Sequence, residues 1–219
     1  MRTYQLIQIG LTFLEAAAFI TGLFYWNKVK TSYWKWFVVY LGAIVLGEAA
    51  GLLLLYKFRE PVISRNLYIY FIIPMEFLFF LWLYGRYYAG KKAAYLIFAA
   101  MGLYLVVFLV NVIFLPGTTI WFFPISYLLG VVLLLLLSVI FFLQLISSDA
   151  ILGYRKEMIF WVSLGLLVFY LVSSPYFGLK QLLYDKYRGI FWIYYYIQLG
   201  CNYLMYLFFC CAFIWGQPR

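Results

Sequence analysis

Three glutamates lie inside long apolar runs of this sequence, and their type and setting make them the first candidates for chemistry: Glu15, Glu48 and Glu76. A carboxyl at membrane depth is costly, so it usually faces a protein interior or a water-filled cavity. Because no Lys, Arg or His lies centrally in any apolar run, we expect most of the three to be protonated near neutral pH. Such a group is typical of a site for protons, cations or a cationic ligand. The alternative is that neutral glutamates only hydrogen-bond helices together.

The three glutamates are expected at one depth. Depth is counted from the end of each helix that lies on the same side of the membrane as the N-terminus of the chain. At 1.5 Å per residue, the three glutamates lie about 12–16 Å from that end, near the middle of a hydrocarbon core about 30 Å thick. Consecutive helices are normally neighbours, so the three carboxyls should converge. Gly47 and Gly51 stand around Glu48 with the small-x-x-x-small spacing that lets helices pack closely.

Prolines and further polar residues accompany these acids. Pro74 removes a helical N–H just before Glu76, and Pro175 does the same in a later apolar run, so we expect both to break or hinge their helices. The tyrosine run 194–196, together with Tyr203 and Tyr206, either lines a polar cavity or satisfies its hydroxyls across helices. We add three amides of the later runs to the predicted ligand- or proton-binding site: Asn111, Gln198 and Asn202.

The elements that carry these residues follow from composition. The 219 residues are 68% hydrophobic and only 11% charged, against about 25% charged in a soluble domain. Such a chain cannot cover its surface with polar groups, so its solvent must be lipid. The sequence predicts one all-α domain over 1–219, a polytopic seven-transmembrane-helix bundle without a soluble domain. Its expected helices are 4–26, 34–56, 67–88, 93–115, 122–146, 158–177 and 190–215.

The basic residues indicate membrane topology. The net charge of +9 would favour nucleic acid as a partner of a soluble protein, but here Lys and Arg fall in the connections between apolar runs. We therefore expect no nucleic-acid partner. A slight excess of Lys and Arg on the side opposite the N-terminus, together with the uncharged connection 116–121, favours an outside N-terminus and a cytoplasmic C-terminus. The expected location is the plasma (inner) membrane of a bacterium.

Several function classes lack the residues they need. The chain has no His, the commonest general base and metal ligand. It also has no glycine-rich phosphate loop and no compact acidic motif for Mg²⁺. We therefore predict no catalytic residue, no metal site and no cofactor. An intramembrane hydrolase that uses two of the glutamates is the remaining enzymatic alternative.

Three stretches of the first half of the chain carry a resemblance: Gly47-Glu48, the segment 66–77 with Pro74 and Glu76, and the Tyr/Gly-rich segment 84–88. Through them the chain resembles the seven-helix membrane input modules found at the N-termini of some bacterial sensor kinases. It is also similar to small seven-helix membrane proteins of the Bacteroidetes type. The resemblance implies a sensory role. No output domain follows the last apolar run, so we expect the signal to pass to a separate protein.

These observations leave three hypotheses for function. The leading one is a non-enzymatic sensory or ligand-binding module with a midplane carboxylate site, which works through a protein partner in the membrane. The second is a proton- or cation-coupled carrier of small solutes that uses the same glutamates, since seven helices suit carriers built from three-helix repeats. The third is a structural or assembly subunit whose aromatic faces contact a larger complex. The expected partners are the lipid bilayer, a membrane protein and a small ligand or cation.

Overall fold

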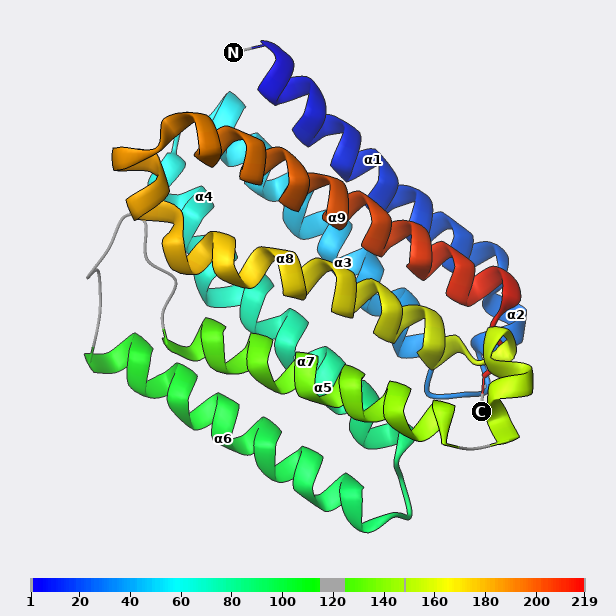
Figure 1. Cartoon of the computed structure of the whole chain (residues 1–219). Coiled ribbons are helices and arrows are strands. Elements are labelled where there is room, and N and C mark those ends of the chain that lie inside the picture. Colours follow the sequence, from blue (N-terminus) through cyan, green and yellow to red (C-terminus); the bar gives the residue numbers. More distant parts are fainter. Residues whose placement is uncertain (1, 115–124, 148, 219) are drawn as a thin grey trace. The chain divides into compact units, whose positions relative to one another are not determined.

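The chain is built of helices, as the computed structural model in Figure 1 shows for residues 2–114, 125–147 and 149–218. Helices account for 90% of it, and the described residues form no strand. The predicted all-α fold is therefore confirmed. The predicted connection 116–121 lies outside the described residues.

Helix length and composition identify a multi-pass membrane protein. Among the described residues, 6 helical stretches are long and apolar enough to cross a membrane: Lys35–Lys57, Pro61–Tyr87, Lys92–Phe114, Ile125–Ile146, Met158–Lys180 and Arg188–Trp215. One further apolar helix, Gly10–Phe24, is shorter. Together they correspond to the seven apolar helices expected from the sequence.

The elements follow one another along the chain with short connections: α1 (Arg2–Phe24), α2 (Trp26–Val29), α3 (Lys35–Leu52), η1 (Leu53–Lys57), α4 (Pro61–Leu67), η2 (Tyr68–Ile72), α5 (Ile73–Tyr87), α6 (Lys92–Phe114), α7 (Ile125–Ile146), η3 (Asp149–Lys156), α8 (Met158–Lys186) and α9 (Arg188–Trp215). The segments η1 and η2 are π-helical. Each of them continues an α-helix, so that α3 with η1, and α4 with η2 and α5, make two long helical stretches.

Two helix boundaries differ by more than three residues from the predicted ones. The third span begins at Pro61, before the expected start at 67, because proline at the first position of a helix has a suitable φ and needs no N–H there. α8 continues to Lys186, beyond the expected end at 177 and through most of the expected connection 180–189. The extension is rich in Leu, Lys and Gln, which favour helix.

The structure divides into two compact units. Unit 1 comprises the described residues of Met1–Glu76, Gly153–Val162 and Tyr206–Arg219, and unit 2 those of Phe77–Leu152 and Ser163–Met205. Each is described separately below. The single domain expected from the sequence stays a prediction.

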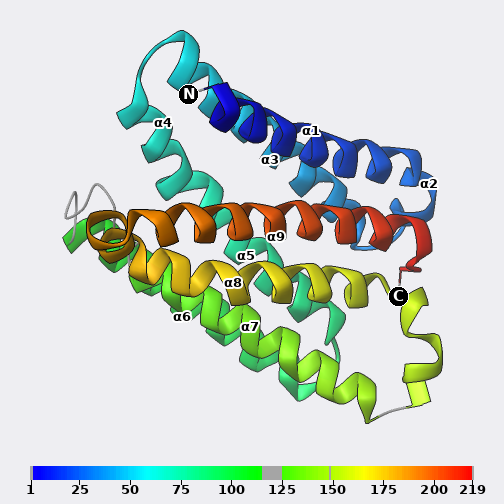
Figure 2. The same cartoon turned by 45° about the horizontal axis from the view of Figure 1, so that its top comes forward.

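In unit 1, α1 and α3 run side by side (Figure 2). Glycines allow this close approach: a Cβ added to Gly22 would stand 3.0 Å from a methyl of Val38, and one added to Gly42 would stand 2.9 Å from the ring of Phe19. In lipid the hydrophobic effect does not drive helices together, so they associate through the close van der Waals packing that small residues allow. The α1–α3 pair is therefore packed tightly enough to position a side chain between its helices.

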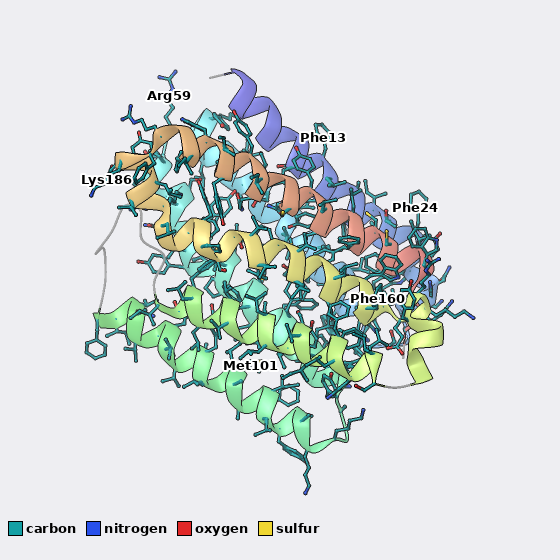
Figure 3. The ribbon with its side chains drawn as sticks, in the orientation of Figure 1. Phe13, Phe24, Arg59, Met101, Phe160 and Lys186 are labelled. Carbon is teal, nitrogen blue, oxygen red and sulfur yellow. The ribbon has the colours of Figure 1, made fainter. Side chains whose placement is uncertain are left out.

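Other side chains of α1 face away from this packing. Phe13 is 72% exposed and Phe24 is 83% exposed, and both extend from the ribbon in Figure 3. Large apolar side chains that remain exposed are expected on a helix whose outer face is covered by acyl chains. Only part of α1 is thus available to hold polar groups inside unit 1.

Unit 2 is built around Phe77 of α5, whose side chain is 0% exposed. Its ring packs against aromatic rings of α6, α7 and α8, with centroid distances of 5.4 Å to Tyr104, 5.5 Å to Tyr127 and 5.6 Å to Tyr170. Figure 1 shows α6 beside α7 within this unit. Aromatic packing of this kind positions the helices rigidly, because each ring is confined on several sides.

A lysine closes the C-terminal end of α9 within unit 1. Lys28 Nζ on α2 donates to the carbonyl of Phe213 at 2.9 Å and to that of Ile214 at 3.5 Å. The last carbonyls of a helix have no partner within the helix and carry partial negative charge, so a cation stabilises them. This contact ties the end of the first span to the end of the last.

Replacing Lys28 by Met should therefore lower the free energy of unfolding by about 0.3–1 kcal/mol. The measurement is the thermal midpoint of the purified chain in detergent micelles. Lys30→Met is the matched control, because the Lys30 side chain is exposed and its Nζ donates to the nearby Asn27 Oδ1 at 2.9 Å instead of to a helix end. Equal shifts in the two variants would contradict the assignment.

Candidate functional site

Glu15 is the most deeply buried of the three predicted glutamates. It lies in the middle of α1 within unit 1, and its side chain is 2% exposed. The hydroxyl of Tyr206 on α9 is hydrogen-bonded to its carboxyl. The other oxygen, Oε2, has no hydrogen-bond partner among the described residues. A buried polar atom without a partner is costly and calls for an explanation.

Glu48 on α3 is partly buried and has a tyrosine partner of its own. The hydroxyl of Tyr68 in η2 donates to Glu48 Oε2 at 2.6 Å. The predicted packing glycines make this contact feasible: a Cβ on Gly51 would stand 2.7 Å from the Tyr68 hydroxyl, and one on Gly47 would stand 3.0 Å from Ile72. The small residues thus let η2 approach α3 closely enough for the phenol to reach the carboxyl.

The structure brings the three glutamates together in unit 1. Glu48 and Glu76 both act electrostatically on Glu15, and Glu48 does so more strongly. Glu76, partly buried in the first turn of α5, also acts on Tyr40 and Tyr206. The carboxyls nevertheless do not form a chelating cluster, since no three acidic, Cys or His side chains of the described residues lie close enough to hold a metal ion.

Two buried tyrosines complete the site. Tyr40 of α3 is 5% exposed and Tyr206 of α9 is 6% exposed. Tyr206 interacts electrostatically with Tyr40 and with all three glutamates, which makes it the shared neighbour of the acids. We refer to the six residues together as the carboxyl centre: Glu15, Tyr40, Glu48, Tyr68, Glu76 and Tyr206.

An aromatic wall supports the two tyrosines. Phe37 of α3 is 0% exposed and lies 5.2 Å from Phe209 and 5.3 Å from Phe213 of α9, measured between ring centroids. Phe37 also stacks on Tyr40 at 6.3 Å, and Tyr206 meets Phe209 edge-to-face at 5.5 Å. Rings confined in this way hold the phenols in place and surround the acids with an apolar environment.

The π-helical segments lie next to the centre. η1 follows the part of α3 that carries Glu48, and η2 contains Tyr68. π-helical turns are rare and are frequently found at functional sites. η2 directly precedes α5, whose second residue, Pro74, has no N–H to give to a carbonyl of the preceding turn.

Neither predicted proline ends its helix. α5 continues through Pro74, and α8 contains Pro175 in its interior and runs on to Lys186. Spanning helices tolerate proline where neighbouring groups satisfy the freed backbone atoms. The role of the two prolines as hinges stays a prediction.

The three predicted amides belong to unit 2, whereas the carboxyl centre is made of unit 1 residues. Asn111 is 6% exposed and Gln198 is 8% exposed. Among the described residues, Asn111 Nδ2 and Asn202 Oδ1 have no hydrogen-bond partner. Among the described residues of unit 2, no hydrogen bond joins the three amides to one another, and their part in ligand binding stays a prediction.

Two tyrosines of the centre, Tyr40 and Tyr68, carry no functional prediction from the sequence. Tyr206 belongs to the tyrosines of the last span that are predicted either to line a polar cavity or to bond across helices. Tyr40 precedes Glu48 by about two turns of the same helix, a spacing that places both on one face. That spacing was the available signal for Tyr40. Tyr68 offered no comparable signal.

The arrangement is suited to binding positive charge, because carboxyl oxygens accept hydrogen bonds and phenols can stabilise either protonation state of a neighbouring acid. Among the described residues, the groups that act on Glu15 are carboxyls and a phenol, with no Lys or Arg.

No family model matches this chain, and no curated protein or solved structure shows a significant match to it.

Proposed function

We propose that the chain is a sensory or ligand-binding membrane module whose carboxyl centre binds positive charge and which acts through a partner protein in the membrane. The observation that supports this is Glu15, a fully buried acid with two further carboxyls nearby and one oxygen without a partner among the described residues. An acid in this position is expensive, and intramembrane acids of this kind usually mark functional sites. The likeness of the glutamate-bearing segments to sensor-kinase input modules favours a sensory role.

The proposal includes a location and an orientation. The location is a bacterial inner membrane, and the distribution of Lys and Arg favours an N-terminus outside and a C-terminus in the cytoplasm. In this orientation the partner protein would respond to the binding of positive charge at the carboxyl centre, either on the cytoplasmic side or within the bilayer.

The test compares the wild-type chain with the triple variant Glu15→Gln/Glu48→Gln/Glu76→Gln, both expressed in native membranes and solubilised gently. We expect a membrane protein to co-purify with the wild type in a fixed ratio and to be retained less by the triple variant, because amides cannot exchange the bound charge. Glu60→Gln is the matched control, since Glu60 is an exposed acid between η1 and α4.

Two outcomes would overturn the proposal. If wild type and triple variant retain the co-purifying protein equally, the carboxyl centre has no part in that interaction. Solute uptake into proteoliposomes that depends on pH and is lost in Glu48→Gln would instead assign the carrier function.

A further inference from the structure

We propose that the ligand of the carboxyl centre is the proton, held exchangeably by Glu15 and positioned by Tyr206. This inference rests on the proposed function and names its ligand. It makes the module a sensor of pH, or of the proton gradient across its membrane.

The first step is the geometry of the acids. A metal ion needs several ligands at once, and no three acidic, Cys or His side chains within the described ranges lie close enough to hold one together. A proton needs one oxygen. Glu15 Oε2 is a buried oxygen that has no hydrogen-bond partner among the described residues. Protonation at this carboxyl removes the charge that burial makes most expensive.

The second step is the set of groups that face Glu15. From α3 come Glu48 and Tyr40, from α5 comes Glu76, and from α9 comes Tyr206. Each carboxylate would oppose a negative charge on Glu15, and within the described part of the chain no Lys or Arg acts on it. The protonation of Glu15 is thereby linked to that of Glu48 and Glu76, so the centre titrates as a coupled group.

The third step is the role of Tyr206 as a positioning residue. When Glu15 is ionised, the Tyr206 hydroxyl donates to the carboxylate, and when the proton is on Oε2 the same hydroxyl still donates to the other oxygen. The hydrogen bond therefore persists in both states and is stronger to the charged form. Tyr206 lies in the last span and packs on Phe209. A change in the protonation of Glu15 therefore acts on the side-chain contacts of α9.

The experiment is a pH titration of the purified full-length chain in lipid nanodiscs, followed by infrared difference spectroscopy. We expect the carbonyl band of a protonated carboxyl in an apolar environment to disappear as the pH rises. The band should be absent from Glu15→Gln. It should persist to higher pH in Tyr206→Phe, which lacks the hydroxyl that stabilises the ionised acid. Tyr196→Phe is the control for Tyr206→Phe, since Tyr196 is 48% exposed on the same helix.

The outcomes separate this inference from the proposed function. Identical titrations of wild type and Tyr206→Phe would overturn the positioning role of Tyr206. Identical spectra of wild type and Glu15→Gln would overturn the assignment of the proton to Glu15. Displacement of the proton by Na⁺ or tetramethylammonium at fixed pH would also overturn it, but would leave a cation-binding module in place. Partner retention is measured separately and does not depend on any of these results.

Discussion

The double variant Glu15→Gln/Glu48→Gln is expected to keep its thermal stability when the pH is raised from neutral to alkaline, whereas the wild-type chain loses stability over the same range. Glu15 is buried and Glu48 is partly buried, and each carries a tyrosine hydrogen bond in place of a cationic partner. Ionising a carboxyl at the centre of a spanning helix costs about 2.5–3.5 kcal/mol on insertion scales. Amides do not ionise, so the variant avoids this cost.

The direction of the effect follows from which form burial disfavours. The folded chain opposes the charged carboxylate more than the unfolded chain does, so stability is present while the acids are neutral and is lost as they ionise. At acidic pH the two proteins should change in parallel. The measurement is the unfolding midpoint in detergent micelles as a function of pH, followed by circular dichroism.

The control for this prediction is Glu60→Gln. Glu60 is exposed, so its amide variant should follow the wild-type curve at every pH. Parallel curves for the wild type and the double variant would mean that folding does not change the protonation of either acid in the tested range, and would contradict the prediction.

The membrane spans could be predicted from the sequence because each apolar run is about as long as a bilayer core is thick. The common depth of the glutamates follows from a related argument, since the rise of an α-helix converts residue counts into depth, and it stays a prediction. Both inferences use only local properties of the chain. The starts and ends of the helices could be predicted less accurately, as the early start at Pro61 and the late end at Lys186 show.

The partners of the glutamates could not be predicted in the same way. The contact between Tyr68 and Glu48 depends on the π-helical turn η2 and on the close approach at Gly51, and neither follows from local propensity. The contact between Tyr206 and Glu15 joins the first span to the last. Such pairs are decided by tertiary packing, so the sequence predicts a site at these acids but does not indicate which phenols contact them.

Glycines that look alike in the sequence have different roles in the structure. Gly51 places Tyr68 against Glu48, and Gly42 accommodates Phe19 of α1, so both serve the packing around the carboxyl centre. Gly102 of α6 has nothing within 4 Å of the position that a Cβ would take. The effect of a side chain at each glycine therefore depends on the neighbouring helix, which makes glycine substitutions a direct test of the packing.

A large effect of this kind is expected for Gly130→Val in unit 2, with a loss of about 1–3 kcal/mol in the free energy of unfolding. A Cβ at Gly130 would stand 2.6 Å from two ring atoms of Phe77. The ring cannot move away easily, because it is 0% exposed and is enclosed by Tyr104, Tyr127 and Tyr170. The measurement is the unfolding midpoint of the purified variant in detergent.

Gly102→Val is the matched control, because it places the same side chain in a spanning helix at an exposed position with no neighbour within 4 Å. Valine has a higher helix propensity than glycine, so the control should unfold at the same temperature as wild type or slightly above it. A double-mutant cycle completes the test. Phe77→Leu empties part of the space beside Gly130, so the cost of Gly130→Val should be smaller in that background than in wild type. Additive effects would show that the clash with Phe77 is not what destabilises the variant.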